Sequence, residues 1–216
     1  MKTTILFDLD GTLIDSTEAI VESFRHSLAQ HGMREEVPEA AITSQIGHTL
    51  ETMFAAVGIP AEQIETHVAT YKLYYREISR HKTILLPGAI EAIGEASAFA
   101  RLGIVTTKTG LYSRELMEHF GVMEYFEVLI GREHVANPKP HPEPIEKALM
   151  EMRVSKESAW MIGDTRLDIE ASNRAGIGCV AVTSGYDNSE QLLTLTDIIQ
   201  PDALEAVRYI AKRGRK

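Results

Sequence analysis

The stretch ILFDLDGTL, residues 5–13, decides the fold and supplies the first candidate functional residues. An apolar run ends in two aspartates, Asp8 and Asp10, which flank a single residue, and Gly11 follows at once. Because side chains alternate along an extended strand, both carboxylates are expected on the same side, where they repel each other unless a cation or a proton relieves the charge. A turn or a helix cap would explain one aspartate and the glycine, but not the pair.

A second acidic strand end lies in the stretch MIGDTRLD, residues 161–168. Asp164 would leave the tip of the strand, and Asp168 would lie one helical turn later on the same face. Asp164 or its neighbour could simply be the N-cap of the following helix. Capping needs only one residue, however, so the second carboxylate is left unexplained. Four aspartates from two strand ends make a hard, oxygen-rich site that suits Mg²⁺.

Two further segments carry polar groups that suit phosphate. The strand expected over residues 102–106 ends in Thr106, and Thr107 and a helix N-terminus follow, so hydroxyl and backbone N–H groups can contact phosphate oxygens there. Lys139 lies between two prolines that fix its backbone, and its ammonium could neutralise an acyl phosphate or a crowded carboxylate. In isolation, Thr106 and Lys139 would more often be surface-loop residues.

Short apolar runs alternate with helical patterns along most of the chain, which is the rhythm of a parallel sheet covered by helices. We expect strands over residues 4–8, 102–106, 128–130, 158–162 and 178–182. Helices are expected over residues 111–120, 142–152, 166–175, 189–193 and 203–212. The predicted fold class is therefore α/β, with a mainly parallel sheet.

Residues 16–82 break this rhythm, since they contain amphipathic helical segments separated by glycine and proline but no convincing strand. Apolar residues recur there at helical spacing, in the sets Ile20, Phe24, Leu28 and Val68, Tyr71, Leu73, Tyr75, Ile78. The simplest interpretation is an α-helical cap of residues 16–82 inserted into a catalytic core of residues 1–15 and 83–216. Insertions tend to cover the carboxyl edge of an open sheet, where ligands bind, so the cap is a candidate lid.

The composition is that of an ordinary globular protein. Of the 216 residues, 44% are hydrophobic and 25% charged, and the formal net charge of −9 is opposite to the basic footprint of a nucleic-acid binder. The single cysteine, Cys179, excludes an intramolecular disulfide and fits a reducing compartment. The apolar run before Asp8 is too short for a signal peptide or a membrane span. We therefore expect a cytoplasmic protein that binds neither membranes nor nucleic acids.

These four segments, in this order and at strand ends, resemble the four motifs of the haloacid dehalogenase-like superfamily. Residues 8–16 are similar to its first motif, Thr106 to the second, Lys139 to the third, and Asp164 with Asp168 to the fourth. The resemblance spans almost the whole chain outside the helical insertion. It implies a Rossmann-like core with an α-helical cap over the active site.

The resemblance also implies a mechanism. Asp8 would be the nucleophile that forms an aspartyl-phosphate, and Asp10 would act as general acid and then as general base. Mg²⁺ would be held by the Asp8 carboxylate, the Asp10 backbone carbonyl and Asp164, with Asp168 supporting a bound water.

By the same resemblance, Thr106 and Lys139 would bind the phosphoryl oxygens, and Lys139 would also hold the nucleophile in place. Backbone N–H groups near Thr107 would donate further hydrogen bonds to these oxygens. Asp10 favours hydrolysis or transfer of phosphate, because the dehalogenases lack this residue. A phosphonate hydrolase would need a cap lysine that forms a Schiff base. Lys72 is interpreted instead as a solvated helix lysine.

The cap segment SQIGHTL, residues 44–50, is similar to one found in phosphoglycolate phosphatases. Gly47 and His48 there could contact an anionic leaving group, although an ordinary turn between helices explains the segment equally well. The run GIVTTK, residues 103–108, resembles bacterial pyrophosphatases of the superfamily as closely as phosphoglycolate phosphatases.

Several hypotheses for the function follow. The first is a phosphatase similar to phosphoglycolate phosphatase, acting on a small phosphorylated molecule, and inorganic pyrophosphate is a close rival substrate. A sugar-phosphate mutase similar to β-phosphoglucomutase is a third. A Mg²⁺-binding signalling module phosphorylated on Asp8 is disfavoured, because it would need neither Asp10 nor a cap. A monomer and a homodimer fit the sequence equally well.

Overall fold

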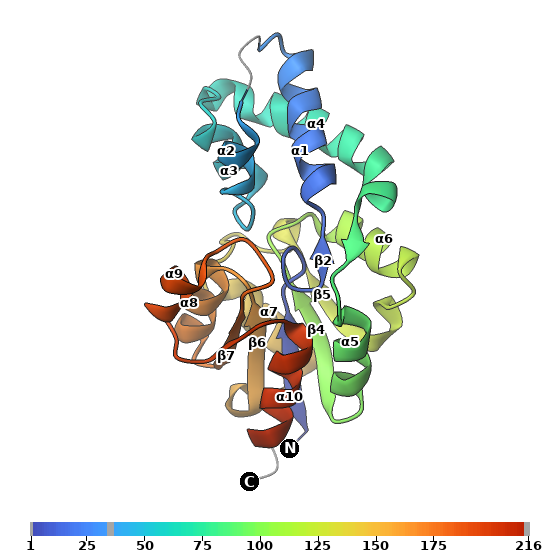
Figure 1. The fold of residues 1–216 in the computed structure, drawn as a ribbon, viewed down its shortest axis with the longest axis vertical. Coiled ribbons are helices and arrows are strands. Elements are labelled where there is room, and N and C mark those ends of the chain that lie inside the picture. Colours follow the sequence, from blue (N-terminus) through green and yellow to red (C-terminus); the bar gives the residue numbers. More distant parts are fainter. Residues whose placement is uncertain (1, 34–36, 214–216) are drawn as a thin grey trace.

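The computed structural model describes residues 2–33 and 37–213 of the chain, so residues 34–36 of the predicted cap and 214–216 of the predicted core lie outside the described residues. Figure 1 shows a sheet with flanking helices and, above it, a group of helices from the first part of the chain. The helices and strands are β1 (Thr3–Phe7), β2 (Ile14–Asp15), α1 (Thr17–Gln30), α2 (Glu39–Thr43), α3 (Leu50–Ala56), α4 (Ala61–Lys82), β3 (Ile84–Leu85), α5 (Ala89–Ser97), β4 (Ala100–Val105), α6 (Gly110–His119), β5 (Phe126–Ile130), α7 (Glu143–Met152), β6 (Ala159–Gly163), α8 (Arg166–Ala175), β7 (Gly178–Val182), α9 (Ser189–Leu193), β8 (Ile199–Gln200) and α10 (Ala203–Arg213), with short 3₁₀ turns at Met123–Tyr125, Arg132–His134 and Lys156–Ser158.

Six parallel strands form the main sheet, in the order β5-β4-β1-β6-β7-β8. The central strand β1 pairs with β4 on one side and β6 on the other, and Phe7 lies opposite both Ile104 and Ile162. The residues that follow β1 and β6, Asp8 and Asp164, are therefore brought to the same edge of the sheet. The predicted α/β fold with a Rossmann-like sheet is confirmed.

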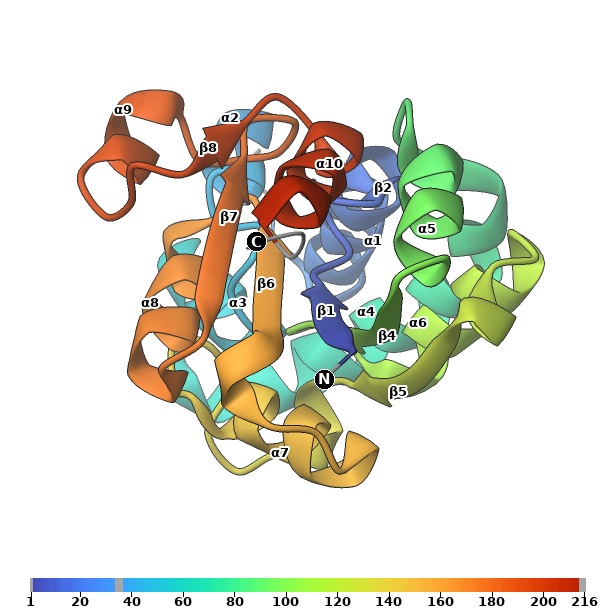
Figure 2. The ribbon, with the colours of Figure 1, turned by 90° about the horizontal axis from the view of Figure 1, so that it is seen from below.

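Helices cover both faces of this sheet, which is why its strands are apolar along their whole length. In Figure 2, α5 and α10 lie on one side of the strands, and α7 and α8 lie on the other. Ile5 and Phe7 pack into the cluster that contains α5 and α10, whereas Leu6, between them, packs against α7 and α8. Each face of β1 is thus fixed by its own buried cluster.

Helices α1 to α4 pack around a third apolar cluster, separate from those of the sheet. Phe24 of α1 stacks on Phe54 of α3 with ring centroids 4.1 Å apart, and its edge meets Tyr71 of α4. Leu73, which the sequence pattern grouped with the buried residues of α4, is 71% exposed. That assignment was wrong because Leu73 lies only two positions from the buried Tyr71 and Tyr75, and so on the opposite face of the helix.

The predicted ends of the core elements lie within two residues of the observed ends. The structure adds β2, β3 and β8, each only two residues long and too short to produce a pattern in the sequence. β2 and β3 pair antiparallel where the chain enters and leaves the helical part, with Ile14 opposite Leu85. The division into a cap of residues 16–82 and a core stays a prediction.

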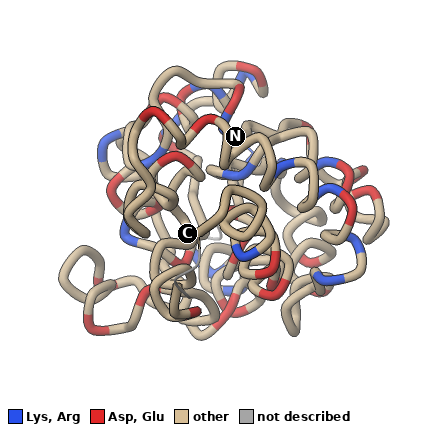
Figure 3. The backbone as a smooth tube through the Cα atoms, turned by 90° about the horizontal axis from the view of Figure 1, so that it is seen from above, with Lys and Arg blue, Asp and Glu red and all other residues tan. Residues whose placement is uncertain are grey.

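The charged residues are mixed over the molecule. Figure 3 shows Lys and Arg interspersed with Asp and Glu along the described backbone. Within the ranges that the structure describes, no helix has the length and apolar character needed to cross a bilayer.

Candidate active site

Three carboxylates meet at the carboxyl edge of the sheet. Asp8 follows β1, Asp164 follows β6, and Asp168 lies in the first turn of α8. One oxygen of each lies within 4.8 Å of the others, and all three residues are buried. Asp164 is held in place because the Thr12 hydroxyl donates to one of its oxygens at 3.1 Å and the Tyr186 backbone N–H donates to the other at 2.9 Å.

Lys139 lies against two of these carboxylates. Its Nζ is 2.9 Å from Asp8 Oδ1 and 2.5 Å from Asp168 Oδ1, and it donates to the Val105 carbonyl at 3.2 Å. Burial would lower the pKa of Lys139, but the Asp168 and Asp8 carboxylates outweigh burial and raise it. The lysine is therefore positively charged and fixed beside the predicted nucleophile.

Asp168 uses its two oxygens for different partners. Oδ2 accepts hydrogen bonds from the Thr165 backbone N–H at 3.1 Å and from the Thr165 hydroxyl at 2.7 Å, which closes a capping box at the start of α8. Oδ1 faces Lys139. The argument that capping leaves Asp168 unexplained was wrong, because a carboxylate can cap with one oxygen and still present the other to the site.

The carboxylate cluster fits a divalent cation. Three buried carboxylates beside the single ammonium of Lys139 would, with all three ionised, leave two negative charges uncompensated among these four side chains. Burial, followed by repulsion from Asp8 and Asp168, raises the pKa of Asp164, and burial raises the pKa of Asp8 to about 7 although Lys139 opposes it. Asp8 Oδ1 is buried against the Lys139 ammonium, without a hydrogen bond from any other donor in the described chain. Hard oxygen ligands with excess negative charge are what Mg²⁺ prefers.

The Asp10 carboxylate does not join this cluster. Ser16 Oγ donates to its Oδ1, and Lys108 Nζ lies 3.1 Å from its Oδ2. Lys108 is itself held 4.6 Å from the centre of the Tyr75 ring. Because β1 ends at Phe7, the strand alternation that grouped the Asp8 and Asp10 carboxylates does not extend to Asp10, although the Asp10 charge still contributes to the raised pKa of Asp8. Any contribution of Asp10 to a metal would have to come from its backbone carbonyl.

Gly11 is required by the turn that follows Asp10. Its φ of +79° is in the left-handed region, which favours glycine. A Cβ at this position would lie 2.3 Å from Asp164 Oδ2 and 2.8 Å from the Cα of Gly185. The turn therefore passes closer to the carboxylate cluster than any residue with a side chain could.

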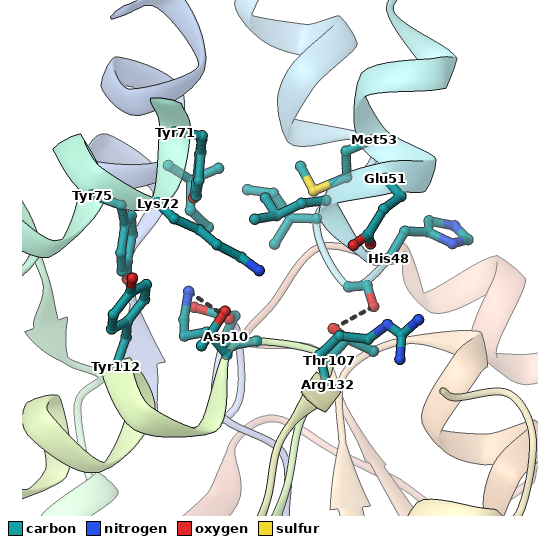
Figure 4. Close-up of a pocket in the computed structure, with 16 residues that line it drawn as sticks. Asp10, His48, Glu51, Met53, Tyr71, Lys72, Tyr75, Thr107, Tyr112 and Arg132 are labelled. Atoms are coloured by element: carbon teal, nitrogen blue, oxygen red, sulfur yellow. Dashed lines mark hydrogen bonds and ion pairs between the residues drawn. The ribbon is translucent and has the colours of Figure 1, made fainter. Parts of the chain in front are cut away.

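The two threonines predicted to bind phosphate have different partners. Thr106 is buried at the end of β4, and its hydroxyl accepts a hydrogen bond from the Lys108 backbone N–H at 3.2 Å. The Thr107 hydroxyl instead donates to the Gly47 carbonyl at 2.8 Å, as the dashed line in Figure 4 shows. The predicted substrate residues Thr107 and Gly47 thus contact each other and join the core to the helical part.

His48, the other predicted substrate residue of this segment, lines the cavity beside Asp10. Its Nε2 lies 3.4 Å from the Arg166 guanidinium. Burial, and then the charge of Arg166, lower the pKa of His48, so the imidazole is neutral at neutral pH. His48 can offer one ring hydrogen bond to a ligand but no positive charge.

Two lysines of this cavity were missed or misjudged from the sequence. Lys108 was not predicted as a site residue, although it follows Thr106 by two positions. Lys72, interpreted as solvated, lines the cavity and extends toward Asp10 (Figure 4). The available signal was its spacing, because Lys72 lies three positions before the buried Tyr75 and therefore on the same side of α4.

Comparison with known proteins adds independent findings. Residues 5–182 match the family described as haloacid dehalogenase-like hydrolase. The pyrophosphatase PpaX of Halalkalibacterium halodurans is 34% identical over 186 residues, which cover 85% of this chain and 83% of that protein. The phosphoglycolate phosphatase of Shigella boydii serotype 4 is 29% identical over 225 residues, covering 93% of this chain and 87% of that protein. The solved structure of a haloacid dehalogenase-like family hydrolase from Streptococcus pneumoniae matches with a TM-score of 0.86 and 30% identity, covering 96% of this chain and 98% of that one.

Proposed function

The chain belongs to the haloacid dehalogenase-like hydrolase family and is a phosphoric monoester hydrolase, and from this premise we propose that it hydrolyses a small metabolite similar to 2-phosphoglycolate through an aspartyl-phosphate on Asp8. The observation that carries the proposal is the meeting of Asp8, Asp164 and Asp168 beside Lys139 at one edge of the sheet. A buried nucleophile, a fixed cation and an oxygen-rich metal site are the parts that phosphoryl transfer needs.

In the first step an oxygen of Asp8 attacks phosphorus, and the bond from phosphorus to the leaving oxygen breaks. The Asp10 carboxyl, oriented by Ser16 and Lys108, donates a proton to the leaving oxygen as that bond breaks. The Lys139 ammonium balances the negative charge that gathers on the phosphoryl oxygens. Thr106, at the end of the neighbouring strand, contributes its hydroxyl to the same oxygens.

In the second step a water attacks the phosphorus of the aspartyl-phosphate. Asp10, which has given up its proton, now accepts one from that water, and the bond between phosphorus and the Asp8 oxygen breaks. The products are inorganic phosphate, the free Asp8 carboxylate and a protonated Asp10. One carboxyl group, that of Asp10, thus serves as acid in the first step and as base in the second.

We assign Mg²⁺ to the carboxylates of Asp8 and Asp164 and the backbone carbonyl of Asp10, with Asp168 acting through a bound water. When bound, the ion offsets negative charge on the transferring phosphoryl group. Residues 16–82 are assigned the role of a lid, since the Thr107–Gly47 contact joins them to the core beside the site.

Inorganic pyrophosphate is the second candidate substrate. It is favoured by the 34% identity to the pyrophosphatase PpaX, which exceeds the identity to the phosphoglycolate phosphatase. Both substrates would use the same nucleophile and acid, and they differ only in the group that leaves.

A phosphate-release assay tests the proposal. The purified protein with Mg²⁺ is compared on 2-phosphoglycolate, pyrophosphate and β-glucose 1-phosphate, and the Asp8→Asn variant serves as the blank. We expect the largest kcat/KM on 2-phosphoglycolate. A mutase would interconvert the sugar phosphates without net release of phosphate, and that result would contradict the proposal.

A further inference from the structure

A cavity lies directly beside Asp10, between the carboxyl edge of the sheet and helices α1, α3 and α4 (Figure 4). Ile20, Leu50 and Met53 give it an apolar wall, and Asp10 and Thr107 belong to its core side. If Asp10 protonates the leaving oxygen, the rest of the leaving group has to occupy this cavity. The side chains that line it therefore decide which leaving groups are accepted.

Lys72 is one of two cations of this cavity that lack a carboxylate partner among the described residues. Its half-buried side chain extends from α4 toward Asp10, and no hydrogen bond or ion pair is made to it within residues 2–33 and 37–213. Lys82, ten positions further along the same helix, pairs with Glu18 at 2.6 Å and Glu22 at 2.7 Å. Lys108, across the cavity, is paired with Asp10.

The remaining charges of the cavity do not cancel that of Lys72. Glu51 also lines it but is exposed, so water screens its charge. Arg132 donates to the Val135 carbonyl at 3.0 Å, and its Nε is buried without an acceptor in the described chain. Two cations without a carboxylate partner, Lys72 and Arg132, thus face one screened carboxylate. Such a cavity attracts an anionic ligand.

We propose, on the basis of the phosphatase function above, that Lys72 selects substrates whose leaving group carries its own negative charge, either a carboxylate or a second phosphate. An ammonium has three donors and no acceptor, so it binds an anionic oxygen more strongly than a hydroxyl, which would also need an acceptor for its proton. The apolar wall of Ile20, Leu50 and Met53 offers no hydrogen-bond partner to a sugar hydroxyl on that side of the cavity. Lys72 is therefore a specificity-determining residue, and the substrate class is the small phosphate ester or anhydride with an anionic leaving group.

The test compares 2-phosphoglycolate and pyrophosphate with 2-hydroxyethyl phosphate, which carries an alcohol in place of the carboxylate. The variants are Lys72→Met, Lys72→Arg and the matched control Lys82→Met, which removes a lysine from the same helix away from the cavity. In Lys72→Met the ratio of kcat/KM for 2-phosphoglycolate to that for 2-hydroxyethyl phosphate should fall by about tenfold to a hundredfold. Lys72→Arg should keep most of the ratio, and Lys82→Met should keep all of it.

The inference is overturned if the wild-type protein prefers 2-hydroxyethyl phosphate to both anionic substrates, or if Lys72→Met leaves the ratio unchanged. A total loss of activity in Lys72→Arg on every substrate would also overturn it, because it would indicate a lysine that reacts covalently. Calorimetry measures the binding constants of the same compounds for the Asp8→Asn and Asp8→Asn/Lys72→Met proteins. Because Asp8→Asn removes the proposed nucleophile, this comparison does not depend on turnover. A protein that hydrolyses none of these substrates would refute the proposed function, while the ratio of binding constants would still decide the role of Lys72.

Discussion

The candidate active site has two sides, the core side at the carboxyl edge of the sheet and the cap side on helices α1 to α4, and they differ in how their charges are held. On the core side, Lys139 contacts Asp8 and Asp168, and Asp164 receives two hydrogen bonds from neighbouring loops. On the cap side, Lys72 reaches into a cavity without a carboxylate partner in the described chain. Under the proposed mechanism, the reacting groups are thus fixed before substrate binds, whereas Lys72, which would contact the leaving group, has no carboxylate partner among the described residues.

This difference follows from the elements that carry each side. The core residues lie at the ends of parallel strands whose register is fixed by hydrogen bonds and by two apolar clusters. The cap residues lie on helices that pack around an apolar cluster of their own. Under the proposed mechanism, substitutions on the cap side should alter selectivity without disturbing the chemistry, so substitutions on the two sides should have separable effects.

The largest effect on activity should come from Asp8→Asn, which removes the proposed nucleophile on the core side. An amide oxygen is a poor nucleophile, so phosphate release should fall by roughly four to six orders of magnitude. The melting temperature should not fall, because the substitution keeps the shape of Asp8 and removes one charge from a crowded cluster. Turnover within tenfold of the wild-type rate would rule out Asp8 as the nucleophile.

The next largest effect should come from Asp10→Asn, which removes the proposed acid at the boundary of the two sides. For 2-phosphoglycolate, whose leaving alkoxide needs a proton, kcat/KM should fall by about 10²–10⁴-fold. The loss should be smaller for 4-nitrophenyl phosphate, whose phenolate leaves without one. Asp15→Asn is the matched control, since the Asp15 carboxylate instead accepts from the Thr17 backbone N–H. Equal losses on the two substrates would contradict an acid at Asp10.

A moderate effect is expected on the pH dependence of stability. Burial, above all, raises the pKa of Asp8 from 3.8 to about 7, so between these values the metal-free folded state holds a proton that the unfolded state releases. Stability should therefore fall as the pH rises through this range. Thermal melts of the metal-free protein between about pH 5.5 and 8 should show a steeper fall for wild type than for Asp8→Asn. Added Mg²⁺ should reverse the fall in the wild-type protein, and parallel curves for the two proteins would argue against a buried, charged Asp8.

The smallest expected effect concerns how tightly the Gly11 turn packs against the carboxylate cluster of the core side. Gly11 and Gly32 have nearly the same φ, +79° and +78°, but a Cβ at Gly11 would strike Asp164, whereas no atom of the described residues lies within 4 Å of one at Gly32. Gly32→Ala should cost only the backbone strain, about 1–2 kcal/mol. Gly11→Ala should cost about 1–3 kcal/mol more in the free energy of unfolding, measured with urea. Equal costs would mean that the turn does not press on the carboxylate cluster.

The sequence predicted the core side well, for a physical reason. Apolar runs mark buried parallel strands, and the polar residues at their ends have to meet because parallel strands end at a common edge. Asp8 and Asp164 were predicted to meet in this way, and Asp168 from its position one helical turn after Asp164, whereas Lys139 was singled out by the prolines on either side of it. The Asp10 carboxylate, which strand alternation grouped with that of Asp8, is held instead by Ser16 and Lys108 beyond the end of β1.

The cap side was predicted poorly because its contacts depend on how helices pack. Tyr71 and Tyr75 belong to the apolar cluster of the helices and also line the cavity, so the apolar pattern of α4 does not reveal which polar neighbour faces the site. Lys72 was consequently taken for a solvated residue. The contact between Thr107 and Gly47 joins residues 60 positions apart, and no local pattern predicts it.

Anomalous diffraction from crystals grown with Mn²⁺ in place of Mg²⁺ tests the central claim most directly. The predicted result is a strong peak between the carboxylates of Asp8 and Asp164, which is lost in an Asp164→Asn crystal grown in the same way. A protein active with Mn²⁺ that shows no peak there, or a peak only at the surface carboxylates Glu18 and Glu22, would contradict the metal site on which the mechanism depends.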